Sequence, residues 1–215
     1  SDLELCDGSQ IELKPSISYV GTTDYKLVWI FDVQQLSSVN VMNPIYTQEG
    51  VQDYKIGIKI TDANNCVGQD SINISGLENP TANAGIDREE DWYEDFTLTG
   101  SATGGNPGYS YLWSPKDSLT TAETIQNPKA KLRATTKFYL QVTDSKSCKG
   151  YDTVMVTIVG QPLSVTIEQR PNPFCCGNKV TLEAIASGGN KGGTYAYEWY
   201  NEADLSTIIG TGKTI

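Results

Sequence analysis

Hydrophobic and polar residues alternate along most of this chain with a period of two. The clearest runs are YKIGIKI at 54–60, KFYLQV at 137–142, DTVMVTI at 152–158, KVTLEAI at 179–185 and YAYEWY at 195–200. They are rich in β-branched and aromatic residues, and Gly, Asn, Asp and Pro separate them, which is typical of short strands joined by turns. Helical periodicity is almost absent. The pattern therefore predicts an all-β fold made of sandwiches.

The strand pattern also repeats along the chain. Asp62 and Asp144 are 82 residues apart, and so are Cys66 and Cys148. The tryptophans Trp29, Trp113 and Trp199 keep nearly the same interval. A repeat of domain length indicates a tandem array. We divide the chain into unit one (1–79), unit two (80–160) and unit three (161–215), of which the third is incomplete, and we expect the repeats to continue past Ile215.

The repeated segments ITDANNC at 60–66 and VTDSKSC at 142–148 each join two alternating runs. Asn and Asp favour tight turns because they tolerate left-handed backbone and bond to their own main chain. The repeated motif therefore predicts a β-hairpin and no catalytic site. The alternating aromatic residues before Trp113 and Trp199 are either a core face or a platform for stacking sugars, and we favour the core for the tryptophans.

Composition narrows the range of functions. The net charge is −10 and no basic cluster occurs, which argues against binding to nucleic acid or to anionic membranes. No apolar run approaches the ~18 residues of a membrane-spanning helix. Histidine is absent, so the commonest general base and the commonest zinc ligand are missing. We therefore expect no enzymatic activity and no cofactor.

Five cysteines raise the question of disulfide bonds. Cys6 lies early in unit one and Cys66 lies late, and in an exported chain such a pair predicts a Cys6–Cys66 bond within the unit. Unit two has Asp91 where the early cysteine would be, so Cys148 lacks a partner in its own unit. Cys148 is either free or linked to Cys175 or Cys176.

The segment DREEDWYED at 87–95 is the most acidic stretch of the chain. Asp87, Glu89 and Asp91 could supply oxygen ligands to Ca²⁺, which binds six to eight of them. The EF-hand spacing is absent, and a solvated charged loop is the alternative interpretation.

Unit two, with TANAGID, FTLTGSATGGNPGYSYLWSPKDSL and QVTDSKSCKGYDTVMVTI, resembles the immunoglobulin-like, PKD-like repeats in large surface proteins of Bacteroidota. Unit one is similar in its Cys-x-Gly start and its Thr-Asp-…-Cys end. The Trp-Asp-Phe-Gly-Asp-Gly signature of strict PKD domains is missing. The resemblance implies tandem immunoglobulin-like sandwiches at the bacterial cell surface or outside the cell.

The same resemblance implies a function. Such repeats occur in gliding adhesins and type IX-secreted proteins, where they act mostly as stalks or adhesive modules. The expected partners are neighbouring repeats, and surface glycans or other cell-surface proteins. The alternative is an accessory or spacer module of a secreted polysaccharide-degrading enzyme.

Two further sites follow from the comparison with these repeats. Trp92 and Tyr93 replace small or polar positions of the family, and they are either an exposed contact for a glycan or protein, or a plug that fills the space of the absent disulfide. Ser118, in Asp-Ser-Leu, matches the form that Bacteroidota O-glycosylate, and we expect it in a loop.

Overall fold

The computed structural model describes residues 2–18, 24–170, 177, 179–189 and 194–215. Its helical elements in these ranges are two short 3-10 turns, η1 (Val33–Gln35) and η2 (Lys116–Ser118). All other elements there are strands. No helix in this part of the chain is long and apolar enough to cross a membrane. The predicted all-β class is confirmed.

Unit one contains a four-stranded sheet of order β1-β6-β5-β3 and a two-stranded sheet of β2 and β4. Its strands are β1 (Leu3–Cys6), β2 (Gln10–Glu12), β3 (Tyr25–Phe31), β4 (Ile45–Thr47), β5 (Tyr54–Asp62) and β6 (Val67–Leu77). Strand β1 runs parallel to the end of β6, whereas the other pairs are antiparallel. The β5–β6 hairpin is the one that the repeated motif predicts.

Unit two repeats this plan with a four-stranded sheet of order β11-β13-β14-β8 and two short pairs, β10-β7 and β12-β9. Its strands are β7 (Thr81–Asn83), β8 (Arg88–Asp91), β9 (Asp95–Thr97), β10 (Ser101–Thr103), β11 (Ser110–Ser114), β12 (Lys129–Lys131), β13 (Thr136–Thr143) and β14 (Lys149–Val159). Strand β8 pairs in parallel with the end of β14, as β1 does with β6. The two units therefore share the order of their four-stranded sheet and one short pair, and the described strands of unit two add the β10-β7 pair.

In unit three the structure describes two pairs of antiparallel strands. They are β15 (Gln161–Arg170), β16 (Thr181–Gly189), β17 (Glu198–Asn201) and β18 (Asp204–Thr211). Every residue of β15 is exposed. The larger sheets of units one and two have no counterpart among the described residues of unit three.

The tryptophans lie in the cores that the alternation predicts. Trp29 is 6% exposed and Trp113 is 1% exposed, each in the core of its own unit. The indole Nε1 of each of the three tryptophans of the repeat donates a hydrogen bond to a backbone carbonyl 12 or 13 residues further on. The acceptors are Val41 for Trp29 (2.8 Å), Gln126 for Trp113 (3.1 Å) and Gly212 for Trp199 (2.9 Å). This shared contact extends the structural repeat to unit three.

The repeated Thr-Asp-x-x-x-Cys motif forms the turn of each long hairpin. In unit one the Oδ1 atom of Asp62 accepts hydrogen bonds from the backbone N–H groups of Asn64 (2.9 Å) and Cys66 (2.8 Å). Asp144 makes the same two contacts in unit two, both at 2.9 Å. The residues with left-handed backbone are Asn65 (φ 65°) and Ser147 (φ 69°). The motif is therefore a carboxylate-capped turn.

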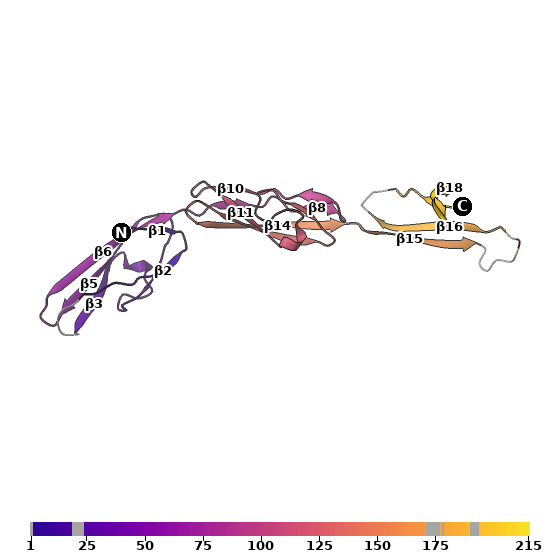
Figure 1. Cartoon of the computed structure of the whole chain (residues 1–215). Coiled ribbons are helices and arrows are strands. Elements are labelled where there is room, and N and C mark those ends of the chain that lie inside the picture. Colours follow the sequence, from indigo (N-terminus) through magenta and orange to yellow (C-terminus); the bar gives the residue numbers. More distant parts are fainter. Residues whose placement is uncertain (1, 19–23, 171–176, 178, 190–193) are drawn as a thin grey trace.

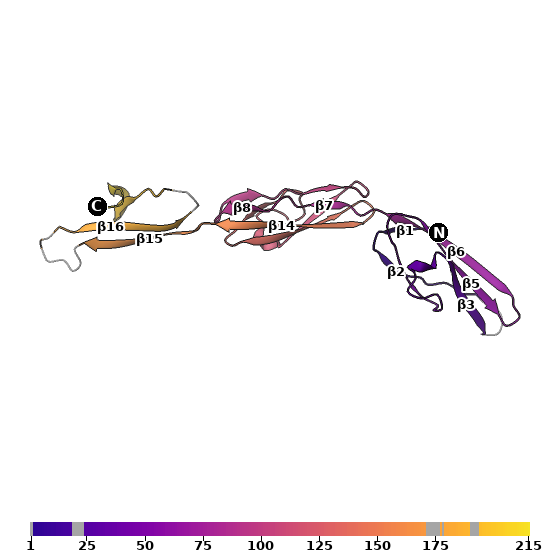
Figure 2. The same cartoon turned by 180° about the vertical axis from the view of Figure 1, so that it is seen from behind.

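The three units follow one another end to end (Figures 1 and 2). At both junctions a proline linker packs against a glycine of the next unit. A Cβ atom on Gly150 would lie 1.9 Å from the carbonyl oxygen of Pro80, and one on Gly188 would lie 2.1 Å from that of Pro162. Only glycine allows so close an approach. The linkers at Pro80 and Pro162 therefore lie in direct contact with Gly150 of unit two and Gly188 of unit three.

Asp144 provides a test of the capped turn. Its carboxylate is 5% exposed, and its Oδ2 atom accepts a third N–H bond, from Asn106, at 2.8 Å. Burial is the largest single influence and raises the pKa of Asp144, but hydrogen bonds from Asn106, Cys148 and Lys146 together outweigh it. The pKa of Asp144 therefore lies below its ordinary value of 3.8.

Because the pKa is lowered in the folded state, Asp144 stabilises unit two above its ordinary pKa, and this stabilisation is lost as pH falls through the folded pKa. We expect Asp144→Asn to reduce the free energy of unfolding by roughly 1–3 kcal/mol at neutral pH. The free energy of unfolding of the variant should also fall less between neutral pH and pH values below 3.8, because asparagine has no carboxylate to protonate. Urea unfolding from pH 2.5 to 7, with the exposed Asp117→Asn as control, measures both. Equal stability of the two variants at neutral pH would contradict the role of the turn.

Candidate functional site

The most distinctive site is the junction between units one and two, where a disulfide joins them. Cys6 ends β1, and Cys148 lies in the carboxylate-capped turn before β14. Their sulfur atoms are bonded, their Cα atoms are 5.4 Å apart, and they are separated by 142 residues in sequence. Cys148 is 1% exposed. The bond closes a loop that contains most of both units.

The predicted Cys6–Cys66 bond is wrong. Cys6 pairs with Leu77 at the last position of β6, whereas Cys66 directly precedes the first residue of that strand. The eleven residues of β6 span roughly 37 Å, which is far beyond the reach of a disulfide. Cys66 is an exposed free thiol. The expectation that Cys148 has no partner within unit two agrees with the structure, but its partner is Cys6. Cys175 and Cys176 lie outside the described residues.

The repeat itself contains a signal for the correct pairing. Cys6 and Asp91 occupy equivalent positions, because each ends a strand that runs parallel to the last strand of its unit. The early position therefore lies at the downstream end of a unit. The Thr-Asp-x-x-x-Cys turn precedes the last strand and so lies at the upstream end. An early cysteine of one unit thus faces the late cysteine of the following unit.

Polar contacts surround the disulfide. Lys146, in the capped turn of unit two, forms an ion pair with Glu4 of β1. In the linker, the side-chain amide of Asn79 donates to the carbonyl oxygen of Asp7 at 2.9 Å. Both partners of the ion pair are about half exposed, so it adds little stability and mainly favours one orientation. The junction is held by covalent, ionic and backbone contacts together.

The acidic stretch does not form the expected loop over its full length. Residues 88–91 are strand β8, which lies beside β14. The Oδ1 atom of Asp87 accepts the backbone N–H of Met155 at 2.8 Å, and Arg88 forms an ion pair with Glu90 at 3.0 Å. Among the described residues, no three His, Cys, Asp or Glu side chains converge as metal ligands would. Asp87, Glu89 and Asp91 are therefore not gathered as a set of ligands in this structure.

Trp92 and Tyr93 form the turn that follows β8, at the end of unit two that faces unit three. Trp92 is half-buried, and its backbone N–H donates to the carbonyl oxygen of Val159 at 2.9 Å. Tyr93 is 39% exposed, has left-handed backbone with φ 58°, and donates its N–H to the carbonyl oxygen of Leu132 at 2.8 Å. The two ring centroids are 5.4 Å apart. The structure thus buries one aromatic ring in part and leaves the other in contact with solvent.

Tyr93 lines a depression of about 470 Å³ on the surface of unit two. The Nζ atom of Lys131 is 4.5 Å from the centroid of the Tyr93 ring, and the Cζ atom of Arg133 is 4.4 Å from it. Ser118, which ends η2 and is half-buried, lines the same depression together with Asp117. Two residues that the sequence singled out separately, Tyr93 and Ser118, therefore lie at one site. We call it the Tyr93 basin.

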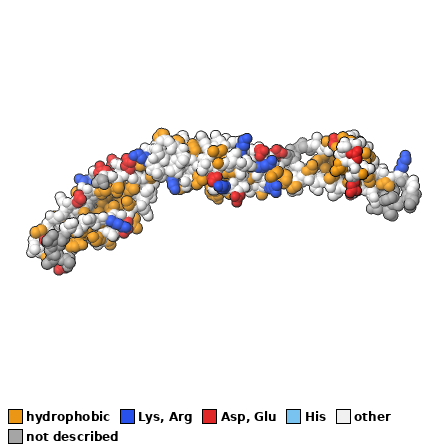
Figure 3. Space-filling model, in the orientation of Figure 1, with side chains coloured by type: hydrophobic (Ala, Val, Ile, Leu, Met, Phe, Trp, Pro, Cys, Tyr) orange, Lys and Arg blue, Asp and Glu red, His pale blue; other side chains and the backbone are white. Residues whose placement is uncertain are grey.

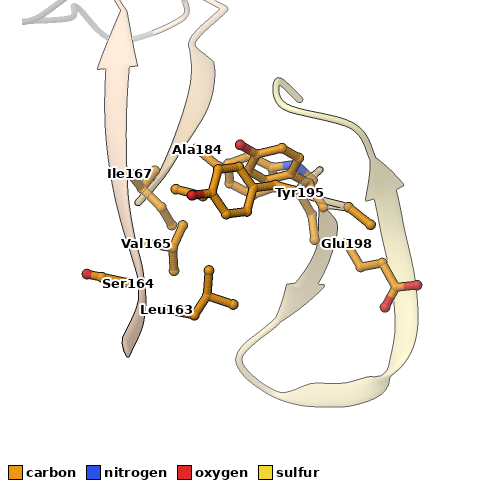
Figure 4. A pocket seen from close by; sticks show the side chains of 11 residues that line it. Leu163, Ser164, Val165, Ile167, Ala184, Tyr195 and Glu198 are labelled. Atoms are coloured by element: carbon orange, nitrogen blue, oxygen red, sulfur yellow. The ribbon is translucent and has the colours of Figure 1, made fainter. Parts of the chain in front are cut away.

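Unit three carries an apolar cavity of about 340 Å³ between the β15–β16 pair and residues 195–199, which lead into β17 (Figure 4). Leu163, Val165 and Ile167 of β15 point into it and are 60% to 66% exposed. Tyr195 lies across from them, and its hydroxyl donates to the carbonyl oxygen of Gly188 at 2.7 Å. Hydrophobic side chains are visible on this unit in the space-filling view (Figure 3). The cavity is thus an open apolar surface between the two strand pairs of unit three.

No family model matches the sequence, and the search of curated proteins gave no match. Among solved structures, the IG1+IG2 pair of DIP-gamma is 14% identical, with a TM-score of 0.30 over 73% of this chain and 93% of that one. The insect immune protein hemolin is 9% identical, with a TM-score of 0.38 over 74% of this chain and 45% of that one. The fibronectin(III)-like modules of CbhA from Clostridium thermocellum are 12% identical, with a TM-score of 0.34 over 74% and 90%. The chain is a tandem array of immunoglobulin-like sandwiches, as its strand pairing and its two cores show independently of these distant matches.

The disulfide assignment predicts a specific peptide map. Digestion without reduction should give the Cys6 peptide linked to the Cys148 peptide, because these cysteines lie at the same junction. Cys66 should react with iodoacetamide in the native protein, because its thiol is exposed and free. A Cys6–Cys66 cross-linked peptide in the native, unscrambled protein would refute the assignment.

Proposed function

We propose that the chain is a non-catalytic segment of an exported bacterial cell-surface protein, in which it serves as a stalk and an adhesive array. The observation that carries the proposal is the disulfide between the first two units. A spacer must keep its domains in line, and a covalent bond across a junction restricts bending there. Disulfides persist in oxidising surroundings, which supports a location outside the cytoplasm.

The bacterial assignment rests on sequence motifs. The motifs of unit two are similar to those of repeats in gliding adhesins and type IX-secreted proteins of Bacteroidota. A role in adhesion or gliding motility follows from that resemblance. The end-to-end arrangement of the units suits such a role, because it places the far end of the array at a distance from its attachment (Figure 1).

Several features support a non-catalytic role. The whole chain lacks histidine, so it has no ordinary Ser-His-Asp triad. In the acidic stretch, the carboxylates of Asp87 and Glu90 are engaged by a backbone N–H and by Arg88. A carboxylate held in this way supports the strand pairing. It is not poised as the acid or base of a hydrolase.

The adhesive part of the proposal centres on the Tyr93 basin. A tyrosine ring offers an apolar face for a sugar at low entropic cost, and Lys131 and Arg133 lie over the same ring. Lys131 also lies 3.9 Å from the carboxylate of Asp95, and Asp117 lines the same depression. Arg133 is therefore the cation on which we base the preference for a ligand with negative groups. The ligand proposed here is therefore a surface glycan that carries carboxylate or sulfate groups.

The stalk is tested by small-angle X-ray scattering. We expect the oxidised protein to give the profile of an elongated particle, and Cys148→Ser to broaden the distance distribution because the first junction then bends more freely. Cys66→Ser is the matched control, since it removes a free thiol and leaves the bridge intact. A profile in which the units fold back into a compact particle would rule out the stalk.

The adhesive contact is tested by Tyr93→Ala on an array of neutral, carboxylated and sulfated glycans. We expect affinity for the charged glycans to fall about tenfold, which corresponds to ~1.4 kcal/mol. Tyr139→Ala is a matched control, because Tyr139 is also exposed in unit two and also has a lysine over its ring, Lys137 at 5.5 Å. Equal binding by the two variants, with equal thermal stability, would exclude the basin as the contact.

A further inference from the structure

We propose that the Cys6–Cys148 bond is a mechanical shunt that carries tension past 142 residues of units one and two. The inference rests on the proposed stalk function, because only a stalk is pulled along its length. It goes beyond stiffness, since it states which part of the chain bears force and which part is shielded.

The shunt follows from two covalent routes that join the same two residues. Tension that enters from the N-terminal side passes along β1 and reaches Cys6. From Cys6 it can pass through the intervening chain or directly across the sulfur–sulfur bond to Cys148. The direct route is already taut, because a disulfide allows its Cα atoms to separate by at most about 7 Å and they are 5.4 Å apart. The intervening chain therefore stays slack.

Downstream of the bridge, the tension enters a strand that is already extended. β14 begins at Lys149, directly after Cys148, and continues to Val159. A strand rises about 3.4 Å per residue and a stretched chain at most about 3.6 Å, so its eleven residues can lengthen by only about 2 Å. Figure 1 shows β14 lying along the length of unit two, with β15 continuing in the same direction. The path from the bridge to unit three is nearly straight.

The rest of unit two is attached to this strand at its sides. β13 pairs with β14 over eight residues, and β8 pairs with it over four. β13 and β8 bond to the sides of β14, but the tension passes along β14 and not through them. Opening of their core would weaken the sandwich without lengthening the stalk. The same holds for unit one after Cys6, all of which lies within the closed loop.

The Cys6–Cys148 bond is partly protected from reduction. Cys148 is 1% exposed and the turn that holds it is capped by Asp144, so reductants have little access from that side. Unit three lies outside the loop between Cys6 and Cys148. Tension should therefore extend unit three while units one and two keep their length.

Single-molecule force spectroscopy tests the shunt, with the intact chain held by tags at its two ends. In the oxidised protein, unfolding of units one and two should add almost no length. After addition of tris(2-carboxyethyl)phosphine at forces that unfold the units, the chain should gain about 500 Å, because 142 residues of up to ~3.6 Å each are released. Extension of unit three should be the same in both conditions and serves as the internal standard.

Two variants sharpen the result. Cys6→Ser should show the long extension without reductant, whereas Cys66→Ser should behave as the native protein does. If Cys6→Ser does not fold, the native protein before and after reduction gives the same comparison. If the chain gains no length after reduction, with reduction of the bond confirmed by peptide mapping, the shunt is overturned. That result leaves the stalk intact, since the stalk depends on the scattering profile and the shunt on the released length.

Discussion

The carboxylate-capped turn decides where the cysteine of each unit lies. By accepting the N–H groups of the second and fourth residues after it, Asp144 holds Cys148 at the very start of β14. Because β14 runs the length of unit two, the start of that strand is the end of the unit that faces unit one. The bond to Cys6, the ion pair beside it and the tension path along β14 all depend on this placement.

Much of the fold could be predicted from the sequence, because alternation and repetition are local signals. The long hairpins at 54–77 and 136–159 and the buried Trp29 and Trp113 follow from them directly. The predicted Cys6–Cys66 bond is wrong because positions that are early and late in the sequence of a unit lie at opposite ends of its last strand. Sequence order hides that Cys6 lies at the downstream end of β6 and Cys66 at its upstream end. The parallel pairing that creates this arrangement leaves no periodic signature.

The candidate contact site illustrates a second limit of sequence reasoning. Tyr93 and Ser118 were singled out for different reasons, and their separation in sequence gave no sign that they line one depression. Lys131 and Arg133 were not singled out at all, since isolated cations on an acidic chain are usually solvated. What joins them is the pairing of Tyr93 with Leu132 through a backbone hydrogen bond. For the acidic stretch at 87–95 the sequence predicts too little structure. Its composition is typical of a loop, but residues 88–91 form β8 at the edge of the four-stranded sheet.

Equivalent turns at the two junctions carry different side chains. After Cys6 the N–H of Asp7 donates to the carbonyl oxygen of Leu77, and after Asp91 the N–H of Trp92 donates to that of Val159 in the same way. The backbone of the two turns is therefore alike, whereas one supplies a covalent link and the other an aromatic pair beside two cations. The second position has Asp91 in place of a cysteine, so no disulfide forms there. One turn thus provides a covalent link and the equivalent turn an aromatic pair, while the parallel pairing of the strand before each turn stays the same.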